Sequence, residues 1–155
     1  MRTERRSAIR KIMATFAGIA GFKIIAQAKD PDSTEKESID IKNFQDVPLF
    51  AGSTRLGNLV FISGTGPDDA SVHEIKKDTD FALRKMEKRL IEAGSSMDKV
   101  LKVTVFLNDI ADFQAMNEVY KGRFGKNPPA RSTIAAAKGG IPGNSIIEID
   151  CIAYI

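Results

Sequence analysis

The sequence has few of the residues from which metal and redox sites are built. Its 155 residues include one cysteine, Cys151, one histidine, His73, and no tryptophan. A single cysteine excludes an intramolecular disulfide and any CxxC motif. One histidine leaves too few soft ligands for a zinc centre, so we predict no metal site. His73 lies in a charged stretch with no nucleophile motif nearby, and we expect it to be solvated rather than part of a Ser-His-Asp triad.

Long hydrophobic runs are also absent. The main apolar run near the N-terminus, residues 12–22, is too short to cross a bilayer as a stable helix. It follows a basic stretch that contains the pair Arg5-Arg6, and it precedes Ala26-Gln27-Ala28, the small-x-small pattern that signal peptidases cleave. The arginine pair resembles a bacterial twin-arginine signal, although Ala8 stands where a large apolar residue is usual.

We therefore predict that residues 1–28 form an export signal and that the protein is periplasmic, with no stable membrane anchor. The alternative is an amphipathic N-terminal helix that is retained in the cytoplasm or lies on a membrane. Residues 29–38 are polar throughout and contain a proline, which is typical of a flexible tether. The globular domain is then expected over residues 39–155, a normal size for one domain.

Excess positive charge is missing from this expected domain. The whole chain carries a net charge of +3, but residues 1–28 alone carry +5 and the remaining residues carry −2. A protein that binds nucleic acid needs a cluster of basic side chains on its folded surface. The charge distribution therefore predicts that nucleic acid is not a partner.

Two kinds of periodicity predict the secondary structure of the domain. Residues 49–55 and 59–63 flank a Gly57-Asn58 turn, the pattern of a β-hairpin. Residues 79–93 have apolar side chains at helical spacing, and a second helical stripe runs from Asp109 or Asp112 to Phe124. Alternating apolar residues predict further strands over residues 101–107, 132–136 and 145–154.

The order β-β-α-β-α-β-β predicts an α+β sandwich in which two helices cover one face of a sheet. Several strands have apolar residues on both sides. Val60 and Ile62, for example, alternate with Leu59 and Phe61. An uncovered face of this kind would be a large apolar patch, so we expect other subunits to bury it.

Common catalytic templates are absent, because the sequence has no phosphate-binding glycine loop and no nucleophile elbow. A double proline, Pro128-Pro129, instead leads directly to Arg131 at the start of a predicted strand. Proline fixes φ, so the arginine enters the strand from a stiff approach. The planar guanidinium is a natural receptor for a carboxylate. Pairing with a neighbouring acid of the chain is the alternative.

An acid, Glu148, interrupts the apolar run of the last strand, and Asp150 shares its face. Such an acid either faces solvent or is buried with a perturbed pKa, and one of the two acids could pair with Arg131. The glycines of Ser63-Gly64-Thr65-Gly66 either form a turn or let a ligand approach the backbone closely. Cys151 lies in an apolar strand and is expected to be a core residue rather than a nucleophile.

Five segments in order closely resemble the reactive intermediate deaminase family, also called the RidA, YjgF or L-PSP family. They are residues 56–64, 92–100, 104–109, 113–120 and 128–132, and the resemblance covers residues 39–155. It implies a chorismate-mutase-like two-layer α+β sandwich with one mixed sheet. It also implies a homotrimer with active sites in the clefts between subunits.

The resemblance further implies hydrolysis of enamine and imine intermediates, such as 2-aminoacrylate and 2-iminopropionate, to 2-keto acids and ammonia. By the same resemblance, Arg131 binds the substrate carboxylate, Glu148 holds the water, and Phe50, Ser63, Gly64 and Thr133 line the pocket. Phe50 stands where the family has a tyrosine, and Thr133 where a cysteine is frequent. The loop after Gly66 is shorter than usual, and the loop over residues 138–144 is about two residues longer.

This chemistry needs no metal or organic cofactor, because an iminium carbon is already electrophilic and the protein need only position the carboxylate and a water. Two other functions share the same residues. A non-catalytic module could bind a small carboxylate at Arg131. A ribonuclease is disfavoured by the −2 charge and by the lack of a histidine base.

Overall fold

The computed structural model describes residues 34–68 and 73–155. The predicted export signal and the first half of the predicted tether, residues 29–33, lie outside the described residues. The first strand, β1, already begins at Glu37, two residues before the expected start of the domain. The strands are β1 (Glu37–Phe44), β2 (Val47–Leu56), β3 (Leu59–Thr65), β4 (Val100–Leu107), β5 (Ala130–Ala135) and β6 (Ile147–Tyr154), and the helices are α2 (Ile75–Glu92) and α3 (Phe113–Tyr120).

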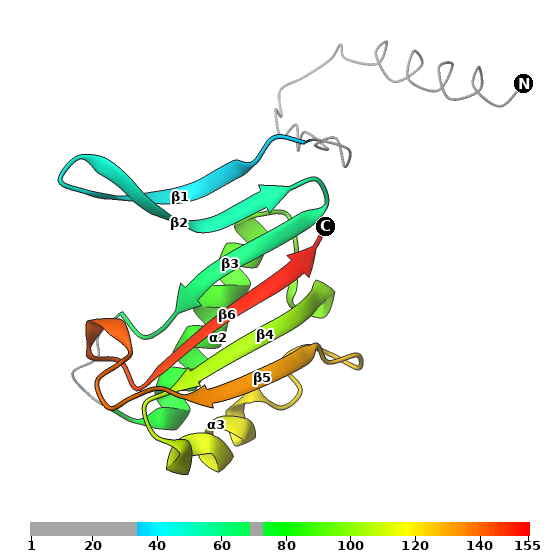
Figure 1. The fold of residues 1–155 in the computed structure, drawn as a ribbon. Coiled ribbons are helices and arrows are strands. Elements are labelled where there is room, and N and C mark those ends of the chain that lie inside the picture. The colour runs from blue at the N-terminus through cyan, green and yellow to red at the C-terminus, as the bar shows by residue number, and fades with distance from the viewer. Residues whose placement is uncertain (1–33, 69–72) are drawn as a thin grey trace, which may run out of the picture.

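One six-stranded sheet carries the fold, in the order β1-β2-β3-β6-β4-β5. The β4–β5 pair is parallel and the other pairs are antiparallel. Both helices lie against the same face of the sheet (Figure 1). The predicted two-layer α+β sandwich with one mixed sheet is therefore confirmed.

The strand β1 is absent from the sequence prediction. Its residues are mostly polar, and the half of the strand nearest the turn to β2 is exposed, so the short alternation of Ile39 and Ile41 did not mark it as a strand. It forms because it pairs along β2 from Glu37 opposite Arg55 to Phe44 opposite Val47. A two-residue turn joins β2 to β3, with Leu56 opposite Leu59 and Gly57 at φ 58°. This turn confirms the predicted hairpin, since such turns need a residue that tolerates positive φ.

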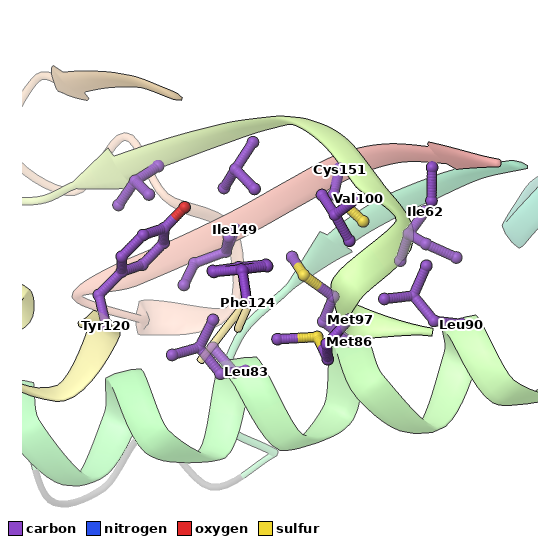
Figure 2. Close-up of a cluster of buried hydrophobic side chains, with 14 of the residues drawn as sticks. Ile62, Leu83, Met86, Leu90, Met97, Val100, Tyr120, Phe124, Ile149 and Cys151 are labelled. Atoms are coloured by element: carbon purple, nitrogen blue, oxygen red, sulfur yellow. The ribbon is translucent and has the colours of Figure 1, made fainter. Parts of the chain in front are cut away.

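The core lies between the sheet and α2. The helix stripe predicted from the sequence is fully buried, and it meets alternate residues of β4 and β6. Figure 2 shows this packing, with Leu83, Met86 and Leu90 of α2 facing Ile149 and Cys151 of β6. The buried residues of the stripe are Ala82, Met86, Leu90 and Ala93.

The helix α3 is shorter than its apolar stripe predicts. It ends at Tyr120, and the chain continues through turns in which Gly122 and Gly125 have positive φ. Phe124, the last member of the predicted stripe, is still buried, and its ring lies 4.9 Å from that of Tyr120. The turn therefore keeps the stripe in the core after the helix has ended.

The face of the sheet opposite the helices retains large apolar side chains at its surface. Phe61 and Tyr154 alternate along their strands with fully buried neighbours, and they are 38% and 39% exposed. The β1–β2 hairpin adds further exposed side chains: Ile41, Phe44, Val47, Leu49 and Phe50. The two-sided apolar strands predicted from the sequence are thus confirmed, and the homotrimer stays a prediction. Within residues 34–68 and 73–155, no helix is both long and apolar enough to cross a membrane.

Candidate functional site

Arg131 occupies the second position of β5, directly after the proline-fixed approach. It lies opposite Val103 of β4, whose side chain is in the core, so both side chains point toward the helix layer. The guanidinium carbon is 4.5 Å from the centre of the Tyr120 ring and 5.6 Å from that of Phe113. Its Nη1 also lies 4.0 Å from the sulfur of Met116. All three contacts come from α3.

These contacts orient the guanidinium without neutralising it. Among the described residues, no carboxylate lies within 4.0 Å of Arg131. A cation held over aromatic rings keeps its charge and its edge donors for another partner. The alternative reading, in which Arg131 pairs with a neighbouring acid of its own chain, is therefore wrong for this structure.

Two buried hydroxyl groups accompany Arg131 on this side of the sheet. The Oγ1 of Thr133 and the phenol oxygen of Tyr120 have no hydrogen-bond partner among the described residues. Burial raises the pKa of Tyr120 to about 12, although the nearby Arg131 opposes the shift, so the phenol stays protonated and can donate. In Figure 2 the Tyr120 hydroxyl points from α3 toward the sheet.

The contact of Tyr120 with Arg131 was not predicted from the sequence, which assigned Tyr120 only to the apolar stripe of a helix. The signal was present in part, because Phe113, Met116 and Tyr120 recur at the spacing of one helix face. That spacing could not indicate that the strand carrying Arg131 crosses this face.

Glu148 lies on the opposite side of the sheet. It pairs with Phe106 of β4, between Ile147 and Ile149, which are fully buried toward the helices. Its carboxylate lies directly against the Cα of Gly64. A Cβ added at Gly64 would overlap the Oε1, Cδ and Cγ atoms of Glu148. Gly64 is therefore required for the close approach of the Glu148 side chain to the backbone.

The backbone at Ser63 and Gly64 is fixed by Arg89 of α2. Its Nη1 donates to the carbonyl oxygens of Ser63 and Gly64 at 3.4 and 3.3 Å and to the Ser63 hydroxyl at 3.2 Å. The Ser63 hydroxyl donates in turn to the carbonyl oxygen of Gly52 at 3.0 Å. Arg89 was not singled out from the sequence, so this supporting contact was not predicted.

The structure separates Arg131 from Glu148 within one copy of the chain. β4 lies between their strands, and Phe106 of β4 pairs with Glu148 on one side and with Ile134 on the other. Arg131 thus lies two strands away from Glu148. It precedes Ile134, the β5 residue level with Glu148, by three residues, and it is on the other face of the sheet. The prediction that Asp150 shares the face of Glu148 holds, so neither acid is on the side of Arg131.

Phe50 is not brought to either residue. It lies on β2 beyond the segment that pairs with β3, and 53% of its side chain is exposed. One copy of the chain therefore holds the predicted site residues as three separate parts: Arg131 with Thr133, Glu148 with Ser63 and Gly64, and Phe50. They can form one site only where copies of the chain meet.

The sequence also drew attention to Cys151, His73 and the possibility of a metal site. Cys151 is buried in the core, and burial raises the pKa of its thiol to about 12, which confirms it as a packed residue. His73 is exposed and its Nε2 lies 3.3 Å from the side-chain nitrogen of Asn144. In the described part of the chain, no three His, Cys, Asp or Glu side chains gather as a metal site.

Comparison with known proteins gives consistent matches. The family model described as Endoribonuclease L-PSP matches residues 43–155. A relative named Reactive Intermediate Deaminase A, chloroplastic, from Arabidopsis thaliana is 31% identical, and the match covers 92% of this chain and 82% of the relative. A Dermatophagoides farinae protein named 2-iminobutanoate/2-iminopropanoate deaminase is 30% identical, with 72% and 89% covered.

Solved structures agree with the fold. The crystal structure of yeast Mmf1 has a TM-score of 0.67 at 26% identity, and the match covers 77% of this chain and 98% of that one. A Mycobacterium tuberculosis member of the YjgF/YER057c/UK114 family also has a TM-score of 0.67 at 26% identity, with 78% and 100% covered.

Proposed function

Because the chain belongs to the reactive intermediate deaminase (L-PSP) family, we propose that it hydrolyses 2-imino acids and their enamine tautomers to 2-keto acids and ammonia. Relatives that are named as deaminases support imine deamination at the level of the family. One observation in the structure carries the proposal to this chain. Arg131 is a charged guanidinium that has no carboxylate partner among the described residues, and it is held on the rings of Tyr120 and Phe113.

Such a guanidinium favours a substrate with a free carboxylate. Its two parallel N–H donors can bind both carboxylate oxygens, which fixes the direction of the adjoining carbon atom. A 2-imino acid places its reactive carbon next to the carboxylate, so binding at Arg131 also orients the reacting bond.

We propose that Glu148 of a neighbouring copy supplies the water. The separation of Arg131 and Glu148 on opposite faces of one copy favours an assembly in which the β5 edge of one copy meets the uncovered face of the next. The exposed apolar side chains on that face, such as Phe61 and Tyr154, favour burial by another subunit. A closed homotrimer would repeat this contact three times.

The reaction balances with water alone. The water oxygen bonds to the iminium carbon as Glu148 accepts one of its protons, which gives a carbinolamine. Glu148 returns that proton to the nitrogen. The C–N bond then breaks as the hydroxyl oxygen forms the new C=O bond. The hydroxyl proton passes to the departing ammonia, so the products are the 2-keto acid and ammonium. Removal of a general base commonly costs about 10²–10⁴-fold in rate.

Single variants test the two roles. Arg131→Ala should lower kcat/KM at least about thirtyfold, and Arg131→Lys should rescue poorly because it lacks the planar pair of donors. Glu148→Gln should lower kcat with little change in KM. The assay measures ammonia from imino acids that an amino-acid oxidase generates in place. Wild-type turnover by Arg131→Ala would overturn the assignment, and 2-keto acid binding without ammonia release would establish a non-catalytic module instead.

A mixing experiment tests whether two copies share the site. Inactive Arg131→Ala and Glu148→Gln chains, unfolded and refolded together in equal amounts, should recover up to about a quarter of wild-type activity, because that share of the sites combines an intact arginine with an intact acid. The Arg131→Ala/Glu148→Gln double variant refolded with wild type is the matched control. No recovery in the mixture, or a monomeric mass by light scattering, would contradict a shared site.

A further inference from the structure

A small cavity of about 210 Å³ adjoins Glu148 on the uncovered side of the sheet. Phe106 and Glu148 form its floor as directly paired residues of β4 and β6. The segment that follows β5 forms the rest of the wall: Ala136, Gly140, Ile141 and Pro142. Glu148 is the only ionisable side chain among these lining residues, and the others are apolar.

Ile141 gives this cavity its wall. It lies in a loop, yet only 4% of it is exposed, and it does not belong to the main core cluster between the sheet and the helices. A buried isoleucine outside the core needs another reason for its position. Here its side chain is buried beside the cavity that Glu148 also lines.

The loop is held in this conformation by its own backbone. The amide of Gly140 donates to the carbonyl oxygen of Ala137 at 2.7 Å, and the amide of Gly139 donates to Oδ1 of Asn108 at 2.9 Å. A Cβ added at Gly140 would lie 2.8 Å from the Ala137 oxygen, so this turn requires glycine. The cavity is therefore preformed and does not depend on a ligand to close the loop.

We propose that this cavity binds the side chain of the imino acid, and that the substrates are 2-imino acids with apolar side chains of about the size of those of leucine and phenylalanine. The proposal rests on the proposed function, since it places the substrate carbon beside the water on Glu148. An apolar cavity of about 150 Å³ accommodates benzene, so this one has room for a branched or aromatic side chain. A methyl group would leave most of it unfilled, and the Glu148 carboxylate disfavours an acidic side chain.

The test compares kcat/KM for imino acids generated from alanine, leucine and phenylalanine. Wild-type protein should favour the leucine-derived substrate over the alanine-derived one by at least about tenfold, since each methylene in an apolar pocket is worth about 10-fold or more. Ala136→Leu puts an isobutyl group into the cavity. It should reduce activity on the two large substrates at least about tenfold and leave the alanine-derived substrate within about threefold.

Ala137→Leu is the matched control, because Ala137 is the next residue of the loop, is exposed and does not line the cavity. It should change no substrate by more than about twofold. Ile141→Ala enlarges the cavity and should shift the preference toward the phenylalanine-derived substrate, so the proposal stays testable if Ala136→Leu fails to fold. Equal effects of Ala136→Leu on all three substrates would overturn the cavity assignment while the proposed function stands. An inactive wild-type protein would overturn both.

Discussion

The contact between Gly64 and Glu148 makes Gly64→Ala an informative perturbation. The added methyl group would occupy the space of the Glu148 carboxylate, so either the side chain must turn away or the strands must separate. Overpacking of this kind typically costs about 1–3 kcal/mol, which corresponds to a Tm lower by roughly 3–9 °C in a chain of this size. Gly64 has no positive φ, so backbone strain adds nothing.

The effect on catalysis should fall on kcat. A displaced Glu148 can no longer hold the water, so kcat should fall by about 10²-fold or more, toward the value of Glu148→Gln. KM should stay within about threefold, because the substrate carboxylate is bound by Arg131, which in the proposed site comes from a neighbouring copy and does not contact Gly64. Steady-state release of ammonia measures both constants.

A double-mutant cycle isolates the cause. In a Glu148→Ala background the overlapping carboxylate is absent, so Gly64→Ala should cost less in the free energy of unfolding, by at least about 1 kcal/mol. The added methyl should also have little further effect on kcat there. Equal losses of Tm in the two backgrounds would refute the reasoning, because they would show that the methyl group clashes with something other than Glu148.

Tyr120→Phe keeps the ring beneath Arg131 and should change KM by less than about threefold. Tyr120→Leu removes the ring and should raise KM about tenfold with kcat nearly unchanged. Equal KM values for the two variants would contradict the role of the ring in holding Arg131. Cys151 should resist iodoacetamide at pH 8 in the native protein and react after unfolding, since burial raises its thiol pKa to about 12. Because this folded pKa lies above the ordinary thiol value of 9.0, the stability that the neutral thiol contributes is complete below pH 9 and is lost as pH rises toward 12. Cys151→Ala should therefore flatten the decline of Tm over that range. We propose that residues 1–28 direct export and are removed by cleavage after Ala28. N-terminal sequencing of protein from the extracytoplasmic fraction should therefore begin at Lys29. A mature chain that begins at Met1 or Arg2 would reject this cleavage.

Local periodicity in the sequence predicted most of the fold. The buried stripe of α2 and the alternation along β4 and β6 are repeated patterns within short segments, and the Gly57-Asn58 turn is set by the conformation that these two residues allow. The family resemblance rested on segments in order along the chain, and the family-model match to residues 43–155 confirms it. The strand β1 was missed because its pairing with β2 stabilises it, while its own residues are largely polar.

The arrangement of the site was decided only by tertiary structure. The sequence identified Arg131 and Glu148 as candidates, but their faces depend on how β4 aligns with β5 on one side and with β6 on the other. That register is fixed by contacts between segments far apart in the chain, and no local pattern encodes it. The ring of Tyr120 beneath Arg131 and the anchoring of Ser63 by Arg89 have the same origin. Residue types and spacing therefore determined which groups could react, and the packing of distant segments determined that one copy of the chain holds them on opposite faces.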